Sequence, residues 1–377
     1  MVQSISCNIL RGGTSKGVFF LEKDLPPMGA ERDKLLLRIM GSPDARQIDG
    51  LGGATSTTSK VAILAPGKQD GIDVDYTFAQ VSVDKAVVSY SGNCGNISSA
   101  VGPFSVDCGL VKASDPVTKV RILNTNTNKI LVEEVQTPGG KICYDGDFEI
   151  PGVPGTAAPV KLHFVEPAGS MGKGLLPTGN VIDKLIVEGI GSLEISIVDA
   201  ANPLVFVRAE DVGMTGKELP SEIDGNKDLL ELLENIRGSA AVLMSLTSES
   251  SRAAWETPGV PKMTIVSAPG DYVSSDGKNI SSESIDLISR MMSMQKAHPT
   301  YAMTGAVCTA AAAVIPGSLV NQACRKDMDP ACLRIGQPKG VLETGVEYSL
   351  GDGGATFIES AYGYRTARLL MKGCAYL

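Results

Sequence analysis

Histidine is nearly absent from this sequence of 377 residues, which contains only His163 and His298. Two isolated histidines nearly exclude a histidine-rich metal site or a Ser-His-Asp triad. The eight cysteines are scattered and never form a Cys-x-x-Cys pair, so we expect reduced thiols in the cytoplasm and no metal site. Proton chemistry is therefore left to cysteine, lysine, carboxylates or the backbone.

Long apolar runs, a signal sequence and grouped positive charges are also missing. No segment approaches the ~18 consecutive apolar residues that a membrane-spanning helix needs, and no apolar core follows a basic leader. The net charge of -8 argues against nucleic acid as a partner, because phosphate binding requires clustered Lys and Arg. We expect no membrane or nucleic acid partner. The net charge does not exclude the binding of a small anion in a local pocket.

Aromatic residues make up only 5% of the chain, while glycine and proline number 42 and 21. This composition predicts many short elements joined by tight turns. Alternating apolar residues predict mostly antiparallel strands in the following segments: QSISCNIL, KGVFFLEK, KVAILAP, VDYTFAQVSV, KAVVSYSG, TKVRILNTNT, KILVEEVQTP, GKICYDGDFEI, SLEISIVDAANPLVFVRAEDVG and KMTIVSA. Helices are predicted in GAERDKLLLRIMG, KDLLELLENIRGSAAVLM and SESIDLISRMMSMQ.

The length predicts two domains, and a Pro- and Gly-rich stretch at 151–180 marks their boundary. We therefore expect domains at 1–182 and 183–377. Two Ala- and Ser-rich segments, GNCGNISSAVGPF and MTGAVCTAAAAVIPG, look alike when shifted by 213 positions, which aligns Gly92 with Gly305 and Pro103 with Pro316. The hypothesis is two similar α/β domains, each wrapped around one central helix, although Ala-rich helices also resemble each other by chance.

Cys94 lies in GNCGN, where a helix is predicted to begin between Gly92 and Gly95. The positive end of a helix dipole favours a thiolate, so a cysteine in this position can act as a base. The alternative is a small buried hydrophobic side chain, which is the usual role of a free cysteine. The neighbouring Gly and Asn residues favour the functional interpretation.

Lys60 ends the polar segment DGLGGATSTTSK and begins an apolar strand. A lysine at the edge of a buried strand loses part of its hydration, which favours the neutral amine that can accept a proton. An ordinary solvated lysine is the alternative. The segment RGGTSKG has the letters of a phosphate loop but not the Walker A order, so we expect it to hold a carboxylate rather than a nucleotide.

Two further segments suggest chemistry in the second half of the chain. Cys308 begins the second predicted central helix and suggests a two-cysteine mechanism, although the shift of 213 aligns Cys94 with Val307 instead. Arg334, Gln337 and Lys339 lie in RIGQPKG, which is either a carboxylate-binding loop or a plain surface turn.

Several motifs in order along nearly the whole chain resemble the PrpF family: RGGTSKG, DGLGGATSTTSK, DYTFAQV, GNCGNISSAVGPF, NTNT, LPTGN and VDAANP. The family includes 2-methylaconitate cis-trans isomerase, 3-methylitaconate Δ-isomerase, aconitate Δ-isomerase and 4-oxalomesaconate tautomerase. The resemblance implies a diaminopimelate epimerase-like fold of two similar domains, each a β-barrel-like, mostly antiparallel sheet around a central helix. It also implies an active site between the domains.

In this resemblance the catalytic lysine and cysteine fall on Lys60 and Cys94. The substrate would be a small unsaturated di- or tricarboxylate, isomerised by allylic proton transfer without a cofactor. Backbone N-H groups near 12–15 and 95–96 would stabilise the dienolate intermediate. The expected substrate-binding residues are Thr14, Ser15, Ser59, Asn93, Gly95, Asn96, Thr304, Gly305, Gln337 and Lys339.

RIGQPKG departs from the GHPSG-like loop of the family, which leaves the identity of the substrate open. Alternatives are a 4-oxalomesaconate-type tautomerase, a two-base epimerase or racemase that uses Cys308, and a non-catalytic carboxylate-binding protein. The sequence does not determine whether the protein forms a homo-oligomer.

Overall fold

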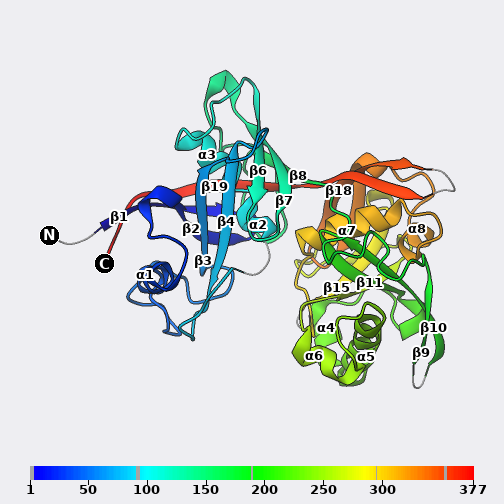
Figure 1. Cartoon of the computed structure of the whole chain (residues 1–377). Coiled ribbons are helices and arrows are strands. Elements are labelled where there is room, and N and C mark those ends of the chain that lie inside the picture. Colours follow the sequence, from blue (N-terminus) through cyan, green and yellow to red (C-terminus); the bar gives the residue numbers. More distant parts are fainter. Residues whose placement is uncertain (1–3, 91–93, 188–189, 294, 352–354) are drawn as a thin grey trace. The chain divides into compact units, whose positions relative to one another are not determined.

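The computed structural model describes residues 4–90, 94–187, 190–293, 295–351 and 355–377 (Figure 1). The helices are α1 Ala30–Met40, α2 Gly95–Ser98, α3 Val101–Asp107, α4 Pro220–Gly225, α5 Lys227–Leu243, α6 Ala253–Glu256, α7 Met303–Ala313 and α8 Leu319–Ala323. Within these described ranges, no helix has the length and apolar character needed to cross a membrane.

The strands lie in two groups along the chain. The first group is β1 Ser4–Gly12, β2 Ser15–Leu21, β3 Lys60–Pro66, β4 Val74–Val81, β5 Val88–Ser89, β6 Val117–Asn124, β7 Lys129–Gln136 and β8 Pro159–Val165. The second group is β9 Asp183–Val187, β10 Gly191–Ala200, β11 Asn202–Arg208, β12 Lys262–Ser267, β13 Tyr272–Val273, β14 Asn279–Ile280, β15 Leu287–Ser293, β16 Lys296–Ala297, β17 Leu333–Gln337, β18 Gly340–Leu350 and β19 Thr356–Tyr376.

The chain packs as two compact units. The first comprises Met1–Val165 together with Tyr364–Leu377, and the second comprises Glu166–Gly363. The domains predicted from the sequence were 1–182 and 183–377. The observed division instead falls after Val165, and it assigns Tyr364–Leu377 to the first unit rather than to the second. The Pro- and Gly-rich stretch contains strand β8, which pairs with β7, and the last strand returns to the first unit.

Eight strands of the first unit form a closed ring in the order β1, β2, β3, β4, β6, β7, β8 and β19, and β19 pairs back to β1. Most neighbours are antiparallel, whereas β2–β3 and β4–β6 are parallel. Helices α2 and α3 contact strands on several sides of this ring, namely β1, β2, β3, β6 and β7. The first unit is therefore a barrel around a central helical segment.

Strand β2 shows why this barrel has two apolar layers. Val18 and Phe20 pack into the cluster that covers α1, whereas Phe19 faces the opposite way and lies 5.4 Å from Phe104 of α3, measured between ring centroids. Both faces of β2 are covered. Its apolar residues therefore follow one another without alternating polar residues, as is typical of a strand buried on both faces.

Glycines in RGGTSKG leave the space that α2 occupies. A Cβ at Gly12 would overlap the carbonyl oxygen of Asn96 in α2. A Cβ at Gly17 would lie 3.0 Å from the carbonyl oxygen of Lys60 and 3.1 Å from Cδ1 of Ile97. The motif therefore acts first as a packing surface for α2.

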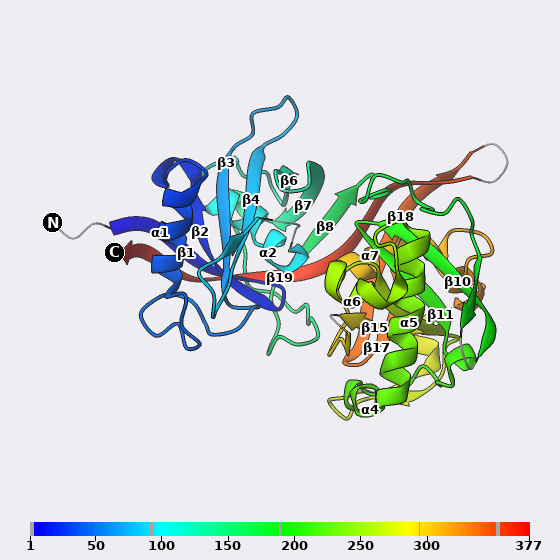
Figure 2. The same ribbon diagram turned by 60° about the horizontal axis from the view of Figure 1, so that its bottom comes forward.

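The second unit repeats the plan. Its strands follow the order β9, β10, β11, β12, β15, β17, β18 and β19, and α7 contacts β10, β11 and β18. Helix α5 packs on the other face of these strands through a large apolar cluster that includes Leu233, Ile236, Val205 and Ile265 (Figure 2). The prediction of two similar α/β domains around central helices is confirmed.

The residue-by-residue alignment of the two central segments is not supported. Helix α7 is continuous, whereas the first segment is broken into α2 and α3. A shift of 213 would place Cys94, the residue that precedes α2, on Val307 inside α7. The two segments are therefore equivalent as central elements, but their helices begin at different points of the proposed repeat.

Two sequence predictions of elements are wrong. The segment 282–295 was predicted to be a helix, but its described residues form a short 3-10 turn, Ser282–Ser284, followed by β15, whose residues from Leu287 to Met292 are all buried. Strand β15 lies between β12 and β17 and carries apolar residues on both of its faces. In the sequence such a continuous apolar run cannot be told from a buried helix. The segment 140–150, predicted as a strand, forms no strand beyond a single bridge from Phe148 to Ala157.

Glu133 is a buried carboxyl group inside the barrel. It lies on β7 with 0% of its side chain exposed, and its Oε2 accepts a hydrogen bond of 2.9 Å from the N-H of Gly102 in α3. Among the described residues its Oε1 has no hydrogen-bond partner. Burial raises the pKa of Glu133 well above its ordinary value, and the bond from Gly102 opposes that shift.

We expect Gly12→Ala to destabilise the first unit, because the added methyl group must push α2 away from β1. Overpacking of this kind costs about 1–3 kcal/mol, which thermal or urea unfolding can measure. The control is Gly225→Ala, since nothing lies within 4 Å of a Cβ at that position. Equal stability of the two variants would contradict the packing role of Gly12.

The buried carboxyl group predicts a pH dependence of stability. Between the unfolded pKa near 4.5 and the raised folded pKa of Glu133, the folded protein keeps a proton that the unfolded chain releases. The free energy of unfolding should then fall with rising pH by up to ~1.4 kcal/mol per pH unit. Glu133→Gln should remove this slope in urea titrations at several pH values, whereas Glu134→Gln on the partly exposed neighbour should keep it.

Candidate active site

Lys60 is the first residue of β3 and is half-buried. Its Nζ donates a hydrogen bond of 2.6 Å to Oε1 of Gln80 and lies 5.1 Å from the ring centroid of Phe78. Among the residues described by the structure, no carboxylate pairs with this ammonium group. A neutral amide partner leaves the lysine free to exchange a proton with a ligand.

Gln80 is itself fixed by the loop that precedes Lys60. Its Nε2 donates to the carbonyl oxygens of Ser59 at 2.9 Å and Ser56 at 3.1 Å. The Ser59 hydroxyl is fully buried and accepts a hydrogen bond of 2.7 Å from Gln47. Ser59 therefore holds the loop in place, and its predicted contact with substrate stays a prediction.

Cys94 directly precedes α2 and is half-buried. Its backbone is extended, and its carbonyl oxygen accepts the N-H of Ser98 at 2.8 Å. The helix thus begins at Gly95, within the range predicted from the sequence. Asn93, one of the expected substrate-binding residues, lies outside the described residues.

Tyr76 is a neighbour of Cys94 that the sequence analysis missed. It lies on β4 with 0% of its side chain exposed. Burial, followed by the nearby Cys94 thiol, raises the pKa of Tyr76 well above its ordinary value, whereas Ser98 opposes the shift. Among the described residues the Tyr76 hydroxyl has no hydrogen-bond partner of ordinary geometry, and Ser98 is its close neighbour.

Asn96 ties the start of α2 to the turn between β1 and β2. Its Nδ2 donates to Oγ1 of Thr14 at 3.0 Å, and its Oδ1 accepts the N-H of Thr14 at 3.3 Å. The same Oδ1 accepts a bond of 3.3 Å from Nε of Arg365. Thr14 and Asn96, both expected to bind substrate, therefore bond to each other, while Ser15 is buried at the start of β2.

The backbone of this turn is also occupied. The N-H of Gly13 donates to the carbonyl oxygen of Thr366 at 2.9 Å, and the N-H of Thr14 donates to Asn96. These two amides cannot also hold an enolate oxygen without giving up their present acceptors. The sequence-based expectation that residues 12–15 form an oxyanion site is therefore not supported at Gly13 and Thr14, whereas the first turn of α2 stays a candidate.

Thr304 and Gly305 form the start of α7 in the second unit. A Cβ at Gly305 would overlap Cε of Met291, so the end of that flexible side chain would have to shift to accept it. Thr304 is half-buried. Their predicted contacts with substrate remain predictions.

The RIGQPKG segment forms the hairpin between β17 and β18, and its polar groups have partners within the unit. Oε1 of Gln337, a residue 1% exposed, accepts the N-H of Lys339 at 3.1 Å. Nζ of Lys339 lies 2.9 Å from Asp276, and Arg334 forms a 2.7 Å ion pair with Asp286. The segment therefore has the contacts of a structural hairpin.

Cys308 is buried in the middle of α7 with 0% of its side chain exposed. Its Sγ donates a hydrogen bond of 3.2 Å to the carbonyl oxygen of Val198. Burial raises the pKa of the Cys308 thiol far above its ordinary value. A protonated, enclosed thiol is a poor second base.

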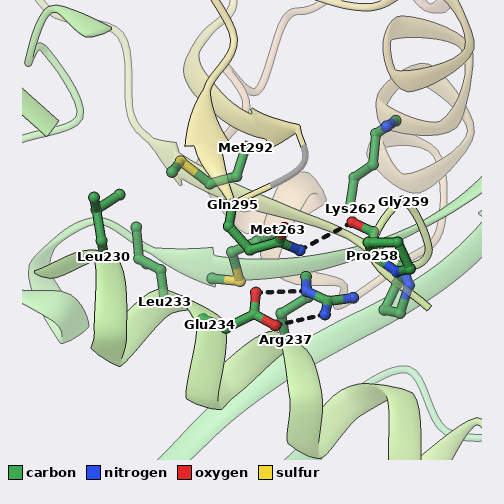
Figure 3. A pocket seen from close by; sticks show the side chains of 11 residues that line it. Leu230, Leu233, Glu234, Arg237, Pro258, Gly259, Lys262, Met263, Met292 and Gln295 are labelled. Atoms are coloured by element: carbon green, nitrogen blue, oxygen red, sulfur yellow. Dashed lines mark hydrogen bonds and ion pairs between the residues drawn. The ribbon is translucent and has the colours of Figure 1, made fainter. Parts of the chain in front are cut away.

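Two cavities of the second unit lie away from all these predicted site residues. Figure 3 shows a crevice beside α5 whose wall is closed by the ion pair of Glu234 and Arg237 and by a hydrogen bond of 3.0 Å from Gln295 to Pro258. Its volume of about 10 Å³ holds one water molecule at most. The other cavity, of about 510 Å³, lies between Arg208, Ser267 and Gln322.

The chain is similar to several isomerases over nearly its whole length. It is 49% identical to a 3-methylitaconate isomerase of Eubacterium barkeri over 374 residues, covering 99% of this chain and 97% of the relative. It is 42% identical to a 2-methyl-aconitate isomerase of Shewanella oneidensis, covering 98% and 96%. A (4E)-oxalomesaconate Delta-isomerase of a Novosphingobium species is 41% identical, covering 100% and 98%.

Solved structures agree with the fold. A methylitaconate-delta-isomerase superimposes with a TM-score of 0.93 at 48% identity, covering 100% of this chain and 96% of the other. A hydroxyproline epimerase of Agrobacterium vitis shares the fold at 12% identity, with a TM-score of 0.55 and coverage of 100% and 94%. The predicted epimerase-like fold is confirmed.

The family described as PrpF protein matches residues 2–377. Relatives with 41–49% identity over almost the entire chain are isomerases. The chain is an isomerase and belongs to the PrpF family.

Proposed function

We propose that this isomerase moves or isomerises the C=C bond of a small unsaturated di- or tricarboxylate, of the 3-methylitaconate, 2-methylaconitate or aconitate type. The proposal assigns proton transfer to Lys60 and Cys94 and uses no cofactor. The names of the relatives support this substrate class, because they act on methylitaconate, methylaconitate and oxalomesaconate.

The observation that carries the proposal is the packing at Gly17. A Cβ at this position would contact both the carbonyl oxygen of Lys60 and the side chain of Ile97. Lys60 begins β3, next to β2 in the barrel, and Cys94 begins the helical segment that contains Ile97. Gly17 therefore lies next to both the strand that begins with Lys60 and the helix that follows Cys94.

The chemistry needs two groups that exchange protons with carbon. One removes a proton from the carbon next to the alkene, and the other returns a proton at the far end of the allyl system. The intermediate is a dienolate, whose charge spreads onto a carboxylate. The N-H groups of Gly95 and Asn96 in the first turn of α2 are the proposed donors to that charge.

The proposal requires no redox step and no electron sink, because only protons and a π-bond change position. Lys60 has an amide rather than a carboxylate beside it, so its proton is not held by an ion pair in the described structure.

We expect Cys94→Ser and Lys60→Gln to fold normally and to lose at least ~100-fold in kcat, since each removes one positioned acid or base. Proton NMR in D₂O would follow alkene signals and deuterium uptake with aconitate isomers, 2-methylaconitate, 3-methylitaconate and oxalomesaconate. Matched controls are Cys374→Ser and Lys141→Gln, because both residues are exposed. Near-normal turnover by either site variant would rule out the assigned pair.

The substrate panel also separates the competing functions. Migration of the alkene in oxalomesaconate alone would indicate a tautomerase of that type. Deuterium appearing at the stereocentre of an amino acid, with no alkene migration, would indicate an epimerase. Binding of a polycarboxylate without any spectral change over hours would indicate a binding protein.

The buried thiol of the second unit gives a further expectation. Cys308→Ala should keep kcat within about twofold, since a positioned group would contribute at least ~100-fold. Iodoacetamide should label Cys94 and leave Cys308 unmodified in the folded protein, as mass spectrometry of tryptic peptides would show. A folded Cys308→Ala protein without activity would restore the two-base epimerase as the better interpretation.

A further inference from the structure

Arg365 is a buried cation without a carboxylate partner. It lies in β19 with 6% of its side chain exposed. Nε donates to Asn96, and Nη1 donates to the carbonyl oxygen of Tyr364 at 2.9 Å. Among the residues that the structure describes, no carboxylate pairs with the guanidinium and Nη2 has no hydrogen-bond partner. Burial alone lowers the pKa of Arg365 to about 10.

Three other buried arginines have carboxylate, ring or additional carbonyl partners, although Nη1 of Arg32 and Nη2 of Arg290 also lack a hydrogen-bond partner among the described residues. Two of them pair with carboxylates, and the third donates to three backbone carbonyls and lies 5.1 Å from the centroid of an aromatic ring. These are Arg32 with Glu22, Arg237 with Glu234, and Arg290 over Tyr272. Arg365 has one backbone carbonyl and one amide oxygen, which is weak compensation for a charge removed from water.

The position of Arg365 connects this charge to the candidate site. Its Nε and the N-H of Thr14 share the same Oδ1 of Asn96, two residues after Cys94. A Cβ at Gly13 would lie 3.1 Å from Cδ of Arg365, so the arginine passes directly beside the turn between β1 and β2. The guanidinium is thus held where that turn meets the start of α2.

A guanidinium is suited to a carboxylate because its planar N-H groups can donate two parallel hydrogen bonds. Polycarboxylates bring two or three negative charges into a site, and Lys60 can balance only one. A cation without a carboxylate partner in the described structure, bonded to Asn96 two residues after the candidate catalytic cysteine, is available to a negatively charged ligand.

We propose that Arg365 binds one carboxylate of the substrate, with Asn96 holding the guanidinium in position. The inference rests on the proposed function for the identity of the substrate. A second carboxylate is then left for other groups, which makes a di- or tricarboxylate a better ligand than a monocarboxylate.

A purely structural role makes the opposite prediction for stability. If Arg365 only ties β19 to α2, its removal must destabilise the free protein. If it is held for a ligand, removal of the uncompensated charge leaves the free protein equally stable or more stable and weakens ligand binding. The two roles are therefore separated by measuring unfolding with and without ligand.

The experiment uses the full-length protein and tricarballylate, a saturated tricarboxylate that cannot undergo alkene migration. Calorimetric titration gives Kd, and thermal unfolding gives Tm with and without the ligand. Arg365→Met should weaken binding about 10-fold to 100-fold, as expected for the loss of charge-assisted hydrogen bonds. Its Tm without ligand should equal or exceed that of the unaltered protein.

The matched control is Arg368→Met, because Arg368 is exposed on the same strand. Its Kd for tricarballylate should stay within twofold of the unaltered protein. Butyrate, which offers one carboxylate, should bind the unaltered protein far more weakly than tricarballylate.

Arg365→Lys covers the case in which Arg365→Met fails to fold. The lysine keeps the charge but lacks the planar fork, so we expect a folded protein with at least fivefold weaker binding. The inference is overturned if the Met or Lys variant binds tricarballylate as the unaltered protein does, if a folded Met variant loses Tm without losing affinity, or if the unaltered protein does not bind tricarballylate.

These outcomes are separate from those of the proposed function. Binding that depends on Arg365, without alkene migration in the substrate panel, would keep the carboxylate site and reject the isomerase substrates. Alkene migration with an unchanged Kd in Arg365→Met would keep the proposed function and reject Arg365 as the anchor.

Discussion

Helix α2 can approach β1 and β2 only because positions 12, 13 and 17 carry no side chain. The candidate site of the first unit depends on this contact. It places Asn96 against the turn at Thr14, where Arg365 also lies, and it sets the helix that follows Cys94 against Gly17, which also contacts the strand of Lys60. A motif that looks like a phosphate loop in the sequence thus serves to let a helix enter the barrel.

Much of the fold could be predicted from the sequence because most strands alternate or carry apolar runs, and α1 and α5 have clear helical periodicity. The failures have a physical cause. Strand β15 is covered on both faces, so its pattern carries no period of two, and a propensity argument favoured a helix. Strand β8 was not recognised in the sequence, because its seven residues lie within the Pro- and Gly-rich segment and are flanked by turns.

The candidate site was only partly predictable for a different reason. Lys60 and Cys94 follow from local motifs, and both lie on the first unit. Arg365 is 269 positions from Asn96 and sits in a strand that reads as ordinary β-structure, so only the pairing of strands reveals the contact. Conversely, local polarity suggested Gln337 and Lys339, but Gln337 bonds to Lys339 within the hairpin and the Lys339 ammonium group pairs with Asp276 of the same unit.

Strand β19 gives the chain an order in which it can be completed. Its end pairs with β1 from Ser4 opposite Tyr376 to Gly12 opposite Ala367. The barrel built mostly from the earliest residues therefore lacks one of its eight strands until residues 364–376 have been synthesised. The second unit can be synthesised in full before the first can close. During translation the first unit therefore keeps an open sheet edge while the second unit is synthesised, and pairing of β19 with β1 and β8 closes that edge.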